Sequence, residues 1–269
     1  MSLRTMGQAA VTMNQLQHQM DMIGHNLANS QTTGYKSRQA EFSNLLTQQI
    51  NNMSNPDNAI NRVTPDGIRI GTGARLGAIH NNLSLGSMQK TGRDLDTMLL
   101  NENHFYQIMV DGETHYTRDG AFYLQPVNNG AEVVLVTQDG YPVNGVNGPI
   151  QFEGNFDAIQ IDRNGAVIVR RGDQNVLAGT IAVAQIERPR SLEAVGDNLF
   201  RIPQNFTDNG LVQQAPLDGS LIESGSLEMS NVSIQEQMTQ LINAQRSYQF
   251  NSRTISMADQ MQGLVNQLR

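Results

Sequence analysis

The residues that could carry chemistry in this chain are five histidines and a scatter of acids, and their spacing forms no recognisable metal site. His18 and His25 are seven residues apart, which is two helical turns and too far to share a metal without a third ligand. His80, His104 and His115 belong to no HxxxH or HExxH motif. The chain has no cysteine, which excludes disulfides and thiolate ligands. We therefore expect neither a metal nor a cofactor.

The strongest candidates for acid–base chemistry are four acids: Asp94, Asp96, Asp119 and Asp139. Two carboxylates on either side of a glycosidic bond can hydrolyse it, so a β domain that binds or cleaves cell-wall glycan is one hypothesis. Asp119 and Asp139 each precede a glycine, however, and Asp in that position stabilises tight turns. No GxSxG elbow, phosphate loop or complete dinucleotide motif is found. The sequence therefore favours a protein that is not an enzyme.

Composition excludes two further classes of partner. Charged residues make up 16% of the 269 residues, below the usual share of about 25%. The net charge of −7 argues against binding nucleic acid through its phosphates. No run approaches the roughly 20 apolar residues that span a bilayer, so we expect no membrane insertion. The N-terminus is amphipathic, without the continuous apolar stretch of a cleaved secretory signal.

An N-terminal helix is predicted by an apolar seam of heptad spacing that ends near Asn29. The apolar residues recur at alternating intervals of three and four, and they are Met6, Ala9, Met13, Leu16, Met20, Ile23 and Leu27. Such a seam exposes apolar side chains unless it packs against a partner. The sequence therefore predicts a helix whose seam is covered in the functional state.

A second helix is predicted at the C-terminus, where Ser233 and Glu236 fit a capping box. Its seam slips around Asn251 and Ser252, which indicates either drift of a straight helix or a local kink. The seam residues are Ile234, Met238, Leu241, Tyr248, Ile255, Ala258, Met261, Val265 and Leu268. The two seams either pair with each other in a monomeric hairpin or pair between subunits, and the pattern alone leaves both open.

The middle of the chain is predicted to be an antiparallel β domain. Turn dipeptides of the Asp-Gly and Asn-Gly type recur from position 111 to 219, and they tolerate the positive φ of tight hairpins. The strand-like runs between them are 105–110, 115–118, 121–124, 133–137, 158–161, 166–170 and 179–186. A helix is expected over 41–53, followed by a polar linker with Pro56 and Pro65.

Several motifs closely resemble those of the flagellar axial proteins, the family of rod, hook and hook-associated subunits. The N-terminal signature comprises Asn26, Leu27, Ala28, Asn29, Thr32, Thr33, Gly34, Tyr35 and Lys36. The C-terminal signatures comprise Leu227, Glu228, Ser230, Asn231 and Val232, then Gln245, Arg246, Tyr248, Asn251 and Ser252. The stretches 91–96 and 116–122 also fit. Length and detail point to the distal-rod-like branch, in the form found in Bacillus-type bacteria, with hook and proximal-rod relatives as alternatives.

The resemblance implies a fold, a location and partners. It implies an α+β chain with helical assembly cores at 1–40 and 227–269, a connecting helix and linker at 41–66, and a β-rich domain at 67–226. The terminal helices would form a coiled-coil-like core of a hollow, torque-transmitting shaft in the flagellar basal body. The partners would be further copies of the chain, other rod and hook subunits, and the flagellar type III export apparatus, which acts without a cleaved signal peptide.

Overall fold

The computed structural model describes residues 2–44, 47–50, 68–71, 74–196, 198–203, 211–216 and 220–267. The chain divides into two compact units, and neither is one continuous stretch. Unit 1 comprises residues 1–27, 38–80 and 234–269, and unit 2 comprises residues 28–37 and 81–233. The α+β class predicted from the sequence is confirmed, because long helices occupy both ends and strands fill the middle.

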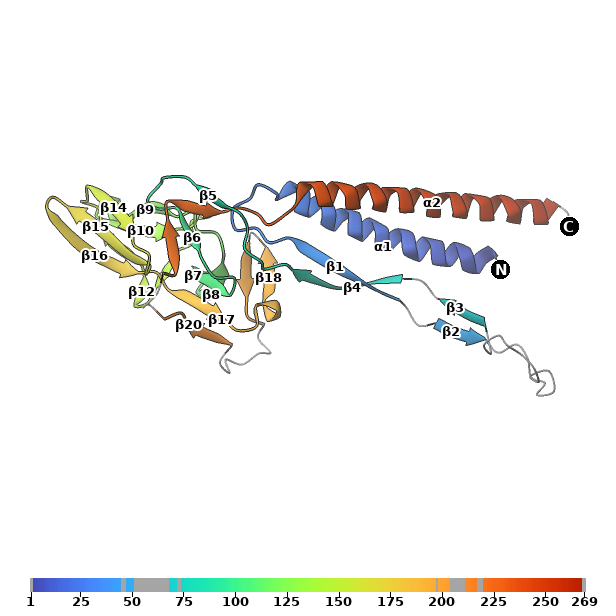
Figure 1. Ribbon diagram of the computed structural model, residues 1–269, viewed down its shortest axis with the longest axis horizontal. Coiled ribbons are helices and arrows are strands. Elements are labelled where there is room, and N and C mark those ends of the chain that lie inside the picture. The colour runs from blue at the N-terminus through green and yellow to red at the C-terminus, as the bar shows by residue number, and fades with distance from the viewer. Residues whose placement is uncertain are drawn as a thin grey trace. The chain divides into compact units, whose positions relative to one another are not determined.

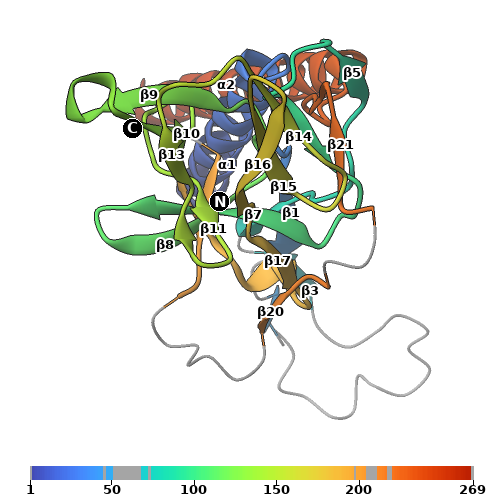
Figure 2. The same ribbon diagram turned by 90° about the vertical axis from the view of Figure 1, so that its left-hand side faces the viewer.

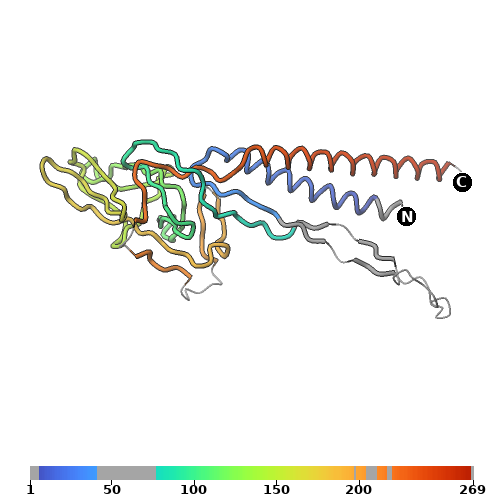
Figure 3. The backbone as a smooth tube through the Cα atoms, in the orientation of Figure 1, coloured from blue at the N-terminus to red at the C-terminus, as the bar shows by residue number. Residues whose placement is uncertain are grey.

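The two helices of unit 1 are α1, Ser2–Ala28, and α2, Ile234–Gln267. They lie side by side and run in opposite directions, so the two chain ends lie at the same end of the pair (Figure 1, Figure 3). Both predicted helices are confirmed, and α2 passes through Asn251 without a break. Within the described residues, neither helix has an apolar stretch long enough to cross a membrane.

The helix predicted over 41–53 is wrong wherever the structure describes that segment. It is replaced by strands β1, Arg38–Asn44, and β2, Thr47–Ile50, while positions 51–66 lie outside the described residues. Strand β1 pairs with β4, Ala74–Asn81, and β2 pairs antiparallel with β3, Ile68–Gly71. Backbone pairing with strands some 20 or more residues away thus overrides local helix propensity, a weak preference that tertiary contacts commonly reverse.

Unit 2 is built on a six-stranded sheet with the order β18-β19-β8-β7-β17-β20. Its pairings are antiparallel, and the hairpin of β7 and β8 turns at Asp111 and Gly112, both at positive φ. The strands are β7 (His104–Val110), β8 (Glu113–Thr117), β17 (Val183–Ile186), β18 (Glu193–Gly196), β19 (Leu199–Arg201) and β20 (Val212–Gln214).

Two three-stranded sheets and three small pairs complete unit 2. In Figure 2 the sheet β13-β10-β9 lies to the left of the sheet β14-β15-β16. Their strands are β9 (Tyr123–Val127), β10 (Glu132–Val136), β13 (Gln151–Glu153), β14 (Ala158–Ile161), β15 (Ala166–Arg171) and β16 (Gln174–Thr180). The pairs are β5 (Met88–Lys90) with β22 (Ser226–Glu228), β6 (Thr97–Leu99) with β21 (Ile222–Ser224), and β11 (Asn144–Gly145) with β12 (Gly148–Pro149). Short 3₁₀ turns are η2 (Asn128–Gly130) and η3 (Pro189–Ser191).

The β prediction is largely confirmed, with corrections to one strand and to two turn dipeptides. The run 179–186 is not one strand, because it contains the end of β16 and all of β17, which belong to different sheets. The dipeptide Asn144-Gly145 is not a turn but the short strand β11, which pairs with Gly148 and Pro149. The turns at Asp111-Gly112, Asn129-Gly130, Asp139-Gly140 and Asn164-Gly165 all place glycine at positive φ, as predicted. The dipeptide Asp119-Gly120 does not, because Gly120 is not at positive φ. The dipeptide at 218–219 lies outside the described residues.

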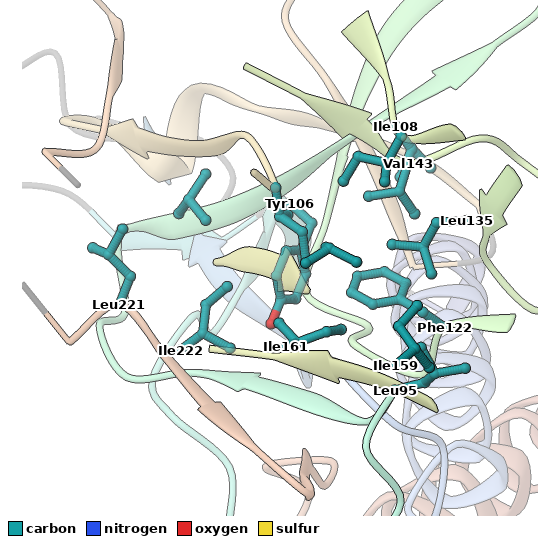
Figure 4. Close-up of a cluster of buried hydrophobic side chains, with 14 of the residues drawn as sticks. Leu95, Tyr106, Ile108, Phe122, Leu135, Val143, Ile159, Ile161, Leu221 and Ile222 are labelled. Atoms are coloured by element: carbon teal, nitrogen blue, oxygen red, sulfur yellow. The ribbon is translucent and has the colours of Figure 1, made fainter. Parts of the chain in front are cut away.

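The core of unit 2 has two clusters of buried side chains, and the larger, of aliphatic and aromatic residues, joins these sheets (Figure 4). Tyr106 and Phe122 are fully buried and meet edge to face, with ring centroids 5.1 Å apart. The Tyr106 hydroxyl donates a hydrogen bond to Thr97 Oγ1 over 2.8 Å, so the one polar atom of this ring is satisfied. The core thus fixes the start of β7, next to which the charged residues described below are placed.

Candidate functional site: the helix pair and a buried charge cluster

The predicted seam of α1 lies along the less exposed side of the helix. Ala9 and Ile23 are buried, and the other five predicted seam residues, Met6, Met13, Leu16, Met20 and Leu27, are partly exposed. None of the seven is in the exposed class. The heptad spacing therefore identified the protected side of α1, and the assembly role of these residues stays a prediction.

The least exposed residues of α2 are small or carry an amide. Gln237, Ala244 and Ala258 are buried and are separated by seven and fourteen residues, which is a heptad repeat. Leu241, Tyr248 and Ile255 lie on the same side and are partly exposed. The side of α2 that is protected within the chain thus differs in part from the predicted seam, because only Leu241, Tyr248, Ile255 and Ala258 belong to both.

Large apolar side chains are also exposed along the length of α2. Four predicted seam residues are among them: Ile234 (47% exposed), Met238 (46%), Met261 (57%) and Val265 (65%). We call this set the outer stripe; its further members are Ile242, Phe250, Met257 and Leu264, each 48–65% exposed. Leu268 lies outside the described residues. Monomeric proteins seldom expose so many large apolar side chains along one helix, and exposed apolar surface of this kind marks protein interfaces.

Asn26 of the N-terminal signature ties the elements of unit 1 together. Its side chain is buried, and its amide oxygen accepts a hydrogen bond from the backbone N–H of Arg38 over 2.9 Å. Its amide nitrogen donates to the Arg38 carbonyl oxygen over 2.8 Å and to Gln237 Oε1 over 3.2 Å. The same amide thus joins the last turn of α1 to the start of β1 and to α2, which only a group that both donates and accepts can do.

In unit 2, three charged side chains from distant parts of the chain meet in the interior. Glu228 Oε1 lies 2.6 Å from Lys36 Nζ, and Glu228 Oε2 lies 3.1 Å from Arg118 Nε and 2.9 Å from Arg118 Nη2. The three side chains, here called the charge cluster, are each at most 1% exposed. Two N–H groups of one guanidinium donate to a single carboxylate oxygen. Such charge-assisted hydrogen bonds are stronger than hydrogen bonds between neutral groups.

The charge cluster holds two cations and one anion, and backbone carbonyls solvate the excess positive charge. Arg118 Nη1 donates to the carbonyl oxygens of Asn101, Glu102 and His104 at 2.6–3.2 Å. Lys36 Nζ also donates to the carbonyl of Ser84 over 2.7 Å. Burial lowers the pKa of Lys36, and the charge of Glu228 opposes that shift. The buried charges are thus paired and hydrogen-bonded, as their low exposure requires.

Close backbone approaches surround the charge cluster, and glycine makes them possible. Gly34 has φ +67°, and a Cβ there would lie 2.6 Å from the backbone nitrogen of Asp119. A Cβ at Gly86 would overlap with the carbonyl oxygen of Met229, and one at Gly120 would overlap with that of Thr97. The N-terminal signature, the segment after β8 and the C-terminal signature are therefore packed too closely here for a side chain.

The four candidate acids have structural partners or lie at the surface. Asp119 Oδ1 accepts the backbone N–H of Ala121 over 3.1 Å, which is the turn-stabilising role predicted for it. Burial raises the pKa of Asp119, its bonds to Ala121 and Thr33 oppose that rise, and the nearby charges of Asp139 and Asp96 add to it. Asp96 Oδ1 accepts from Arg93 Nη1 over 3.0 Å, while Asp94 and Asp139 are exposed.

The histidines remain separate from one another. Across the β7–β8 hairpin, His115 pairs with Ile108, so it does not face His104. His104 is buried, and burial together with the charge of Arg118 lowers its pKa. Among the residues the structure describes, no three acids or histidines gather in a way that could hold a metal ion.

The signature residues fall into two groups. Residues 32–36 and 227–232 come together in unit 2, where Gly34 N–H donates to the Glu228 carbonyl over 2.8 Å. Gln245, Arg246 and Ser252 of the last signature are exposed on α2, and Asn251 Nδ2 donates to the Ser247 carbonyl over 3.0 Å. The sequence did not identify Arg118 as a site residue. The sequence did contain one signal. In a chain with few charges, the stretch 116–122 contains Arg118, the N-terminal signature contains Lys36, and the signature at 227–232 contains Glu228.

Three protein-family models match the chain in order. The "Flagella basal body rod protein" model matches residues 8–36, the "Flagellar hook protein FlgE/F/G D1 domain" model matches 99–169, and the "Flagellar basal body rod FlgEFG protein C-terminal" model matches 223–268. The first and last matches contain the partners Lys36 and Glu228, and the middle one contains Arg118. All three members of the charge cluster thus lie in stretches that the models describe.

Full-length relatives agree with these models. The chain is 43% identical to the flagellar hook-basal body complex protein FlhP of Bacillus subtilis, covering 99% of this chain and 100% of the relative. It is 35% identical to the flagellar basal-body rod protein FlgG of Agrobacterium fabrum and 34% identical to FlgG of Bacillus subtilis. Each of these two similarities covers 98% of both chains.

Proposed function

The chain belongs to the flagellar basal-body rod and hook protein family and is a structural subunit of the rod, and we propose that it polymerises through α1 and α2 into a hollow shaft that transmits torque. Its place is the flagellum, and its partners are further copies of itself and other rod and hook subunits. It performs no catalysis, and it reaches its site through the flagellar export apparatus.

The observation that carries the assembly proposal is the outer stripe of α2. Eight large apolar side chains from Ile234 to Val265 remain 46–65% exposed even though α2 already lies beside α1. Fully burying an exposed side chain of this kind contributes roughly 1.5–3 kcal/mol, and about half of that gain remains for each of these half-exposed side chains, so covering the stripe with neighbouring subunits still supplies a large driving force. We infer that the inner sides of α1 and α2 hold the helix pair together, and that the outer stripe binds the next subunits in a coiled-coil-like manner.

The sheet edges support helices as the assembly elements, because two of the edge strands are protected against strand pairing. Edge strand β9 contains Pro126, which has no N–H to donate. Edge strand β18 has an irregular register between Ala194 and Gly196, and bulges of this kind discourage edge-to-edge association. The β-rich unit 2 is therefore suited to stiffen the shaft without polymerising through its own strands.

The experiment that tests this proposal is a single charge in the outer stripe. Phe250→Asp places a carboxylate at a position that is 65% exposed in the monomer, so it should leave the circular dichroism and thermal unfolding of the purified protein unchanged. It should abolish rod assembly, scored by electron microscopy of basal bodies and by swimming, because the charge would be buried between subunits. Phe250→Leu is the matched control and should assemble. Normal rods with Phe250→Asp would overturn the proposal.

A further inference from the structure

The two terminal links of unit 2 are the segments through which the chain passes to α1 and to α2. Residues 33–37 follow α1, and residues 228–231 precede α2. Gly34 N–H donates to the Glu228 carbonyl over 2.8 Å, and Ser37 N–H donates to Asn231 Oδ1 over 2.8 Å. Position 34 thus faces 228, and position 37 faces 231. Because both numbers rise in the same direction, the two links lie parallel.

A third segment, residues 82–87, lies along both links and confirms their direction. Asn82 N–H donates to the Ser37 carbonyl over 2.8 Å. Along the C-terminal link, Met229 N–H donates to the Ser87 carbonyl, and Asn231 Nδ2 donates to the carbonyls of Asn82 and Ser84. Met229 thus lies beside Ser87, and Asn231 lies beside Asn82 and Ser84. The C-terminal link and segment 82–87 therefore run antiparallel. We call residues 33–37, 82–87 and 228–231, with the charge cluster, the terminal clamp.

From this geometry we propose that the terminal clamp is the mechanical element that resists separation of the two chain ends under tension. Tension on α1 draws the N-terminal link toward its own start, and tension on α2 draws the C-terminal link toward its own end. In a parallel pair those directions are opposite along one axis, so the links must slide past each other. The backbone bond of Gly34, the bond of Ser37 and the Lys36–Glu228 ion pair are then loaded together, not one after another.

The buried position of the charge cluster strengthens this arrangement. Sliding would move Glu228 away from both Lys36 and Arg118 inside a region where these side chains are at most 1% exposed, so water cannot replace the lost contacts at the start of the movement. The inference rests on the proposed function only in that α1 and α2 carry load in the rod. The clamp can be tested on the isolated chain, independently of whether that chain assembles.

The test is single-molecule stretching of the full chain. The chain has no cysteine, so one cysteine added at each terminus gives defined attachment points. Rupture of the clamp followed by unfolding of unit 2 and of strands β1 to β4 should release the loop of 192 residues between Lys36 and Glu228, a gain on the order of 650 Å. A second geometry, from Asn81→Cys to the C-terminus, pulls the antiparallel segments 82–87 and 229–231 apart from one end. It should rupture at a lower force than stretching by the two termini.

Variants separate the clamp from general stability. Asn231→Ala removes the bonds to Ser37, Asn82 and Ser84, and it should raise the rupture rate at fixed force by about tenfold or more. Ile161→Ala is the matched control, because it empties part of the core of unit 2, removes none of the clamp's hydrogen bonds and also lowers equilibrium stability. It should change the rupture rate by less than about threefold, since forced unfolding depends on the contacts that bear the load. Equal rupture forces in the two geometries, or an Ile161→Ala effect as large as that of Asn231→Ala, would overturn the inference.

Discussion

Replacing Glu228 with glutamine tests whether the charge cluster stabilises unit 2 through its charge. The substitution keeps the size of the side chain but raises the buried charge of the cluster from one excess cation to two. Removing one partner of a buried ion pair costs about 3–5 kcal/mol, a large part of the 5–15 kcal/mol that holds a typical domain folded. For a chain of this size, that loss corresponds to a fall in melting temperature of roughly 6–20 °C.

The order of effects among variants is the sharper result. Lys36→Met leaves Arg118 and Glu228 as a balanced pair, so it should cost less than Glu228→Gln, about 1–3 kcal/mol. Glu153→Gln makes the same chemical change in the pair of Glu153 with Arg171, where the Glu153 side chain is 73% exposed, and it should cost less than about 1 kcal/mol. Denaturant unfolding followed by near-ultraviolet tyrosine dichroism reports on unit 2 through Tyr106. If Glu228→Gln cost no more than Glu153→Gln, the electrostatic explanation would be refuted.

The pH dependence of Glu228→Gln provides an independent check. Burial already holds the pKa of Lys36 below its usual value of 10.5, and Glu228 raises it. Without the charge of Glu228, the pKa of Lys36 falls further. Between that lowered pKa and 10.5, the unfolded chain binds more protons than the folded one, so stability increases with pH. The stability difference between Glu228→Gln and the parent should therefore narrow as the pH is raised above neutrality.

Three further predictions concern other parts of the chain. The folded pKa of Asp119 is raised above 3.8, so the protonated Asp119 side chain favours the folded state below pH 3.8, and this stabilisation is lost as the pH rises through the folded pKa. Asp119→Asn stays neutral at every pH. In denaturant titrations its free energy of unfolding should therefore increase relative to that of the parent between pH 3.8 and the folded pKa. Gly34→Ala combines positive φ with overlap at the Asp119 backbone and should cost about 2 kcal/mol or more in thermal unfolding, whereas Gly112→Ala, also at positive φ but with open space, should cost only about 1 kcal/mol. Leu241→Asp adds a charge on the protected side of α2 and should abolish swimming while the subunit is still exported, measured by motility and by immunoblotting of the exported fraction.

The sequence predicted the helices well because their periodicity is local. It assigned the protected side of α2 less well, since it gave weight to large apolar residues such as Met238 and Met261. Those residues lie on the outer stripe, while the protected side contains Gln237, Ala244 and Ala258. Small and amide side chains allow two helices to approach and exchange hydrogen bonds, but hydrophobicity alone does not distinguish them from surface residues.

The remaining errors arose where distant segments decide the structure. Strands β1 and β2 replace a predicted helix because they pair with β4 and β3. No local sequence pattern predicts this pairing. The charge cluster was missed for the same reason. Lys36 and Glu228 were recognised only as parts of signatures, and nothing in their neighbourhoods shows that Arg118 lies between them in the fold. Pairing of buried charges is a tertiary property, so only the three-dimensional structure reveals it.

The discontinuity of the two units has a consequence for the speed of folding. Lys36 and Glu228 are 192 residues apart, and Arg118 and Glu228 are 110 apart, so their contacts close very large loops. The entropic cost of closing a loop increases with the length of the loop, and the chain loses this entropy before the new contact can stabilise it. A helix such as α2 forms within about a microsecond, whereas folds dominated by distant pairings take milliseconds to seconds. The closure of unit 2 around Glu228 is therefore expected to be among the last steps of folding.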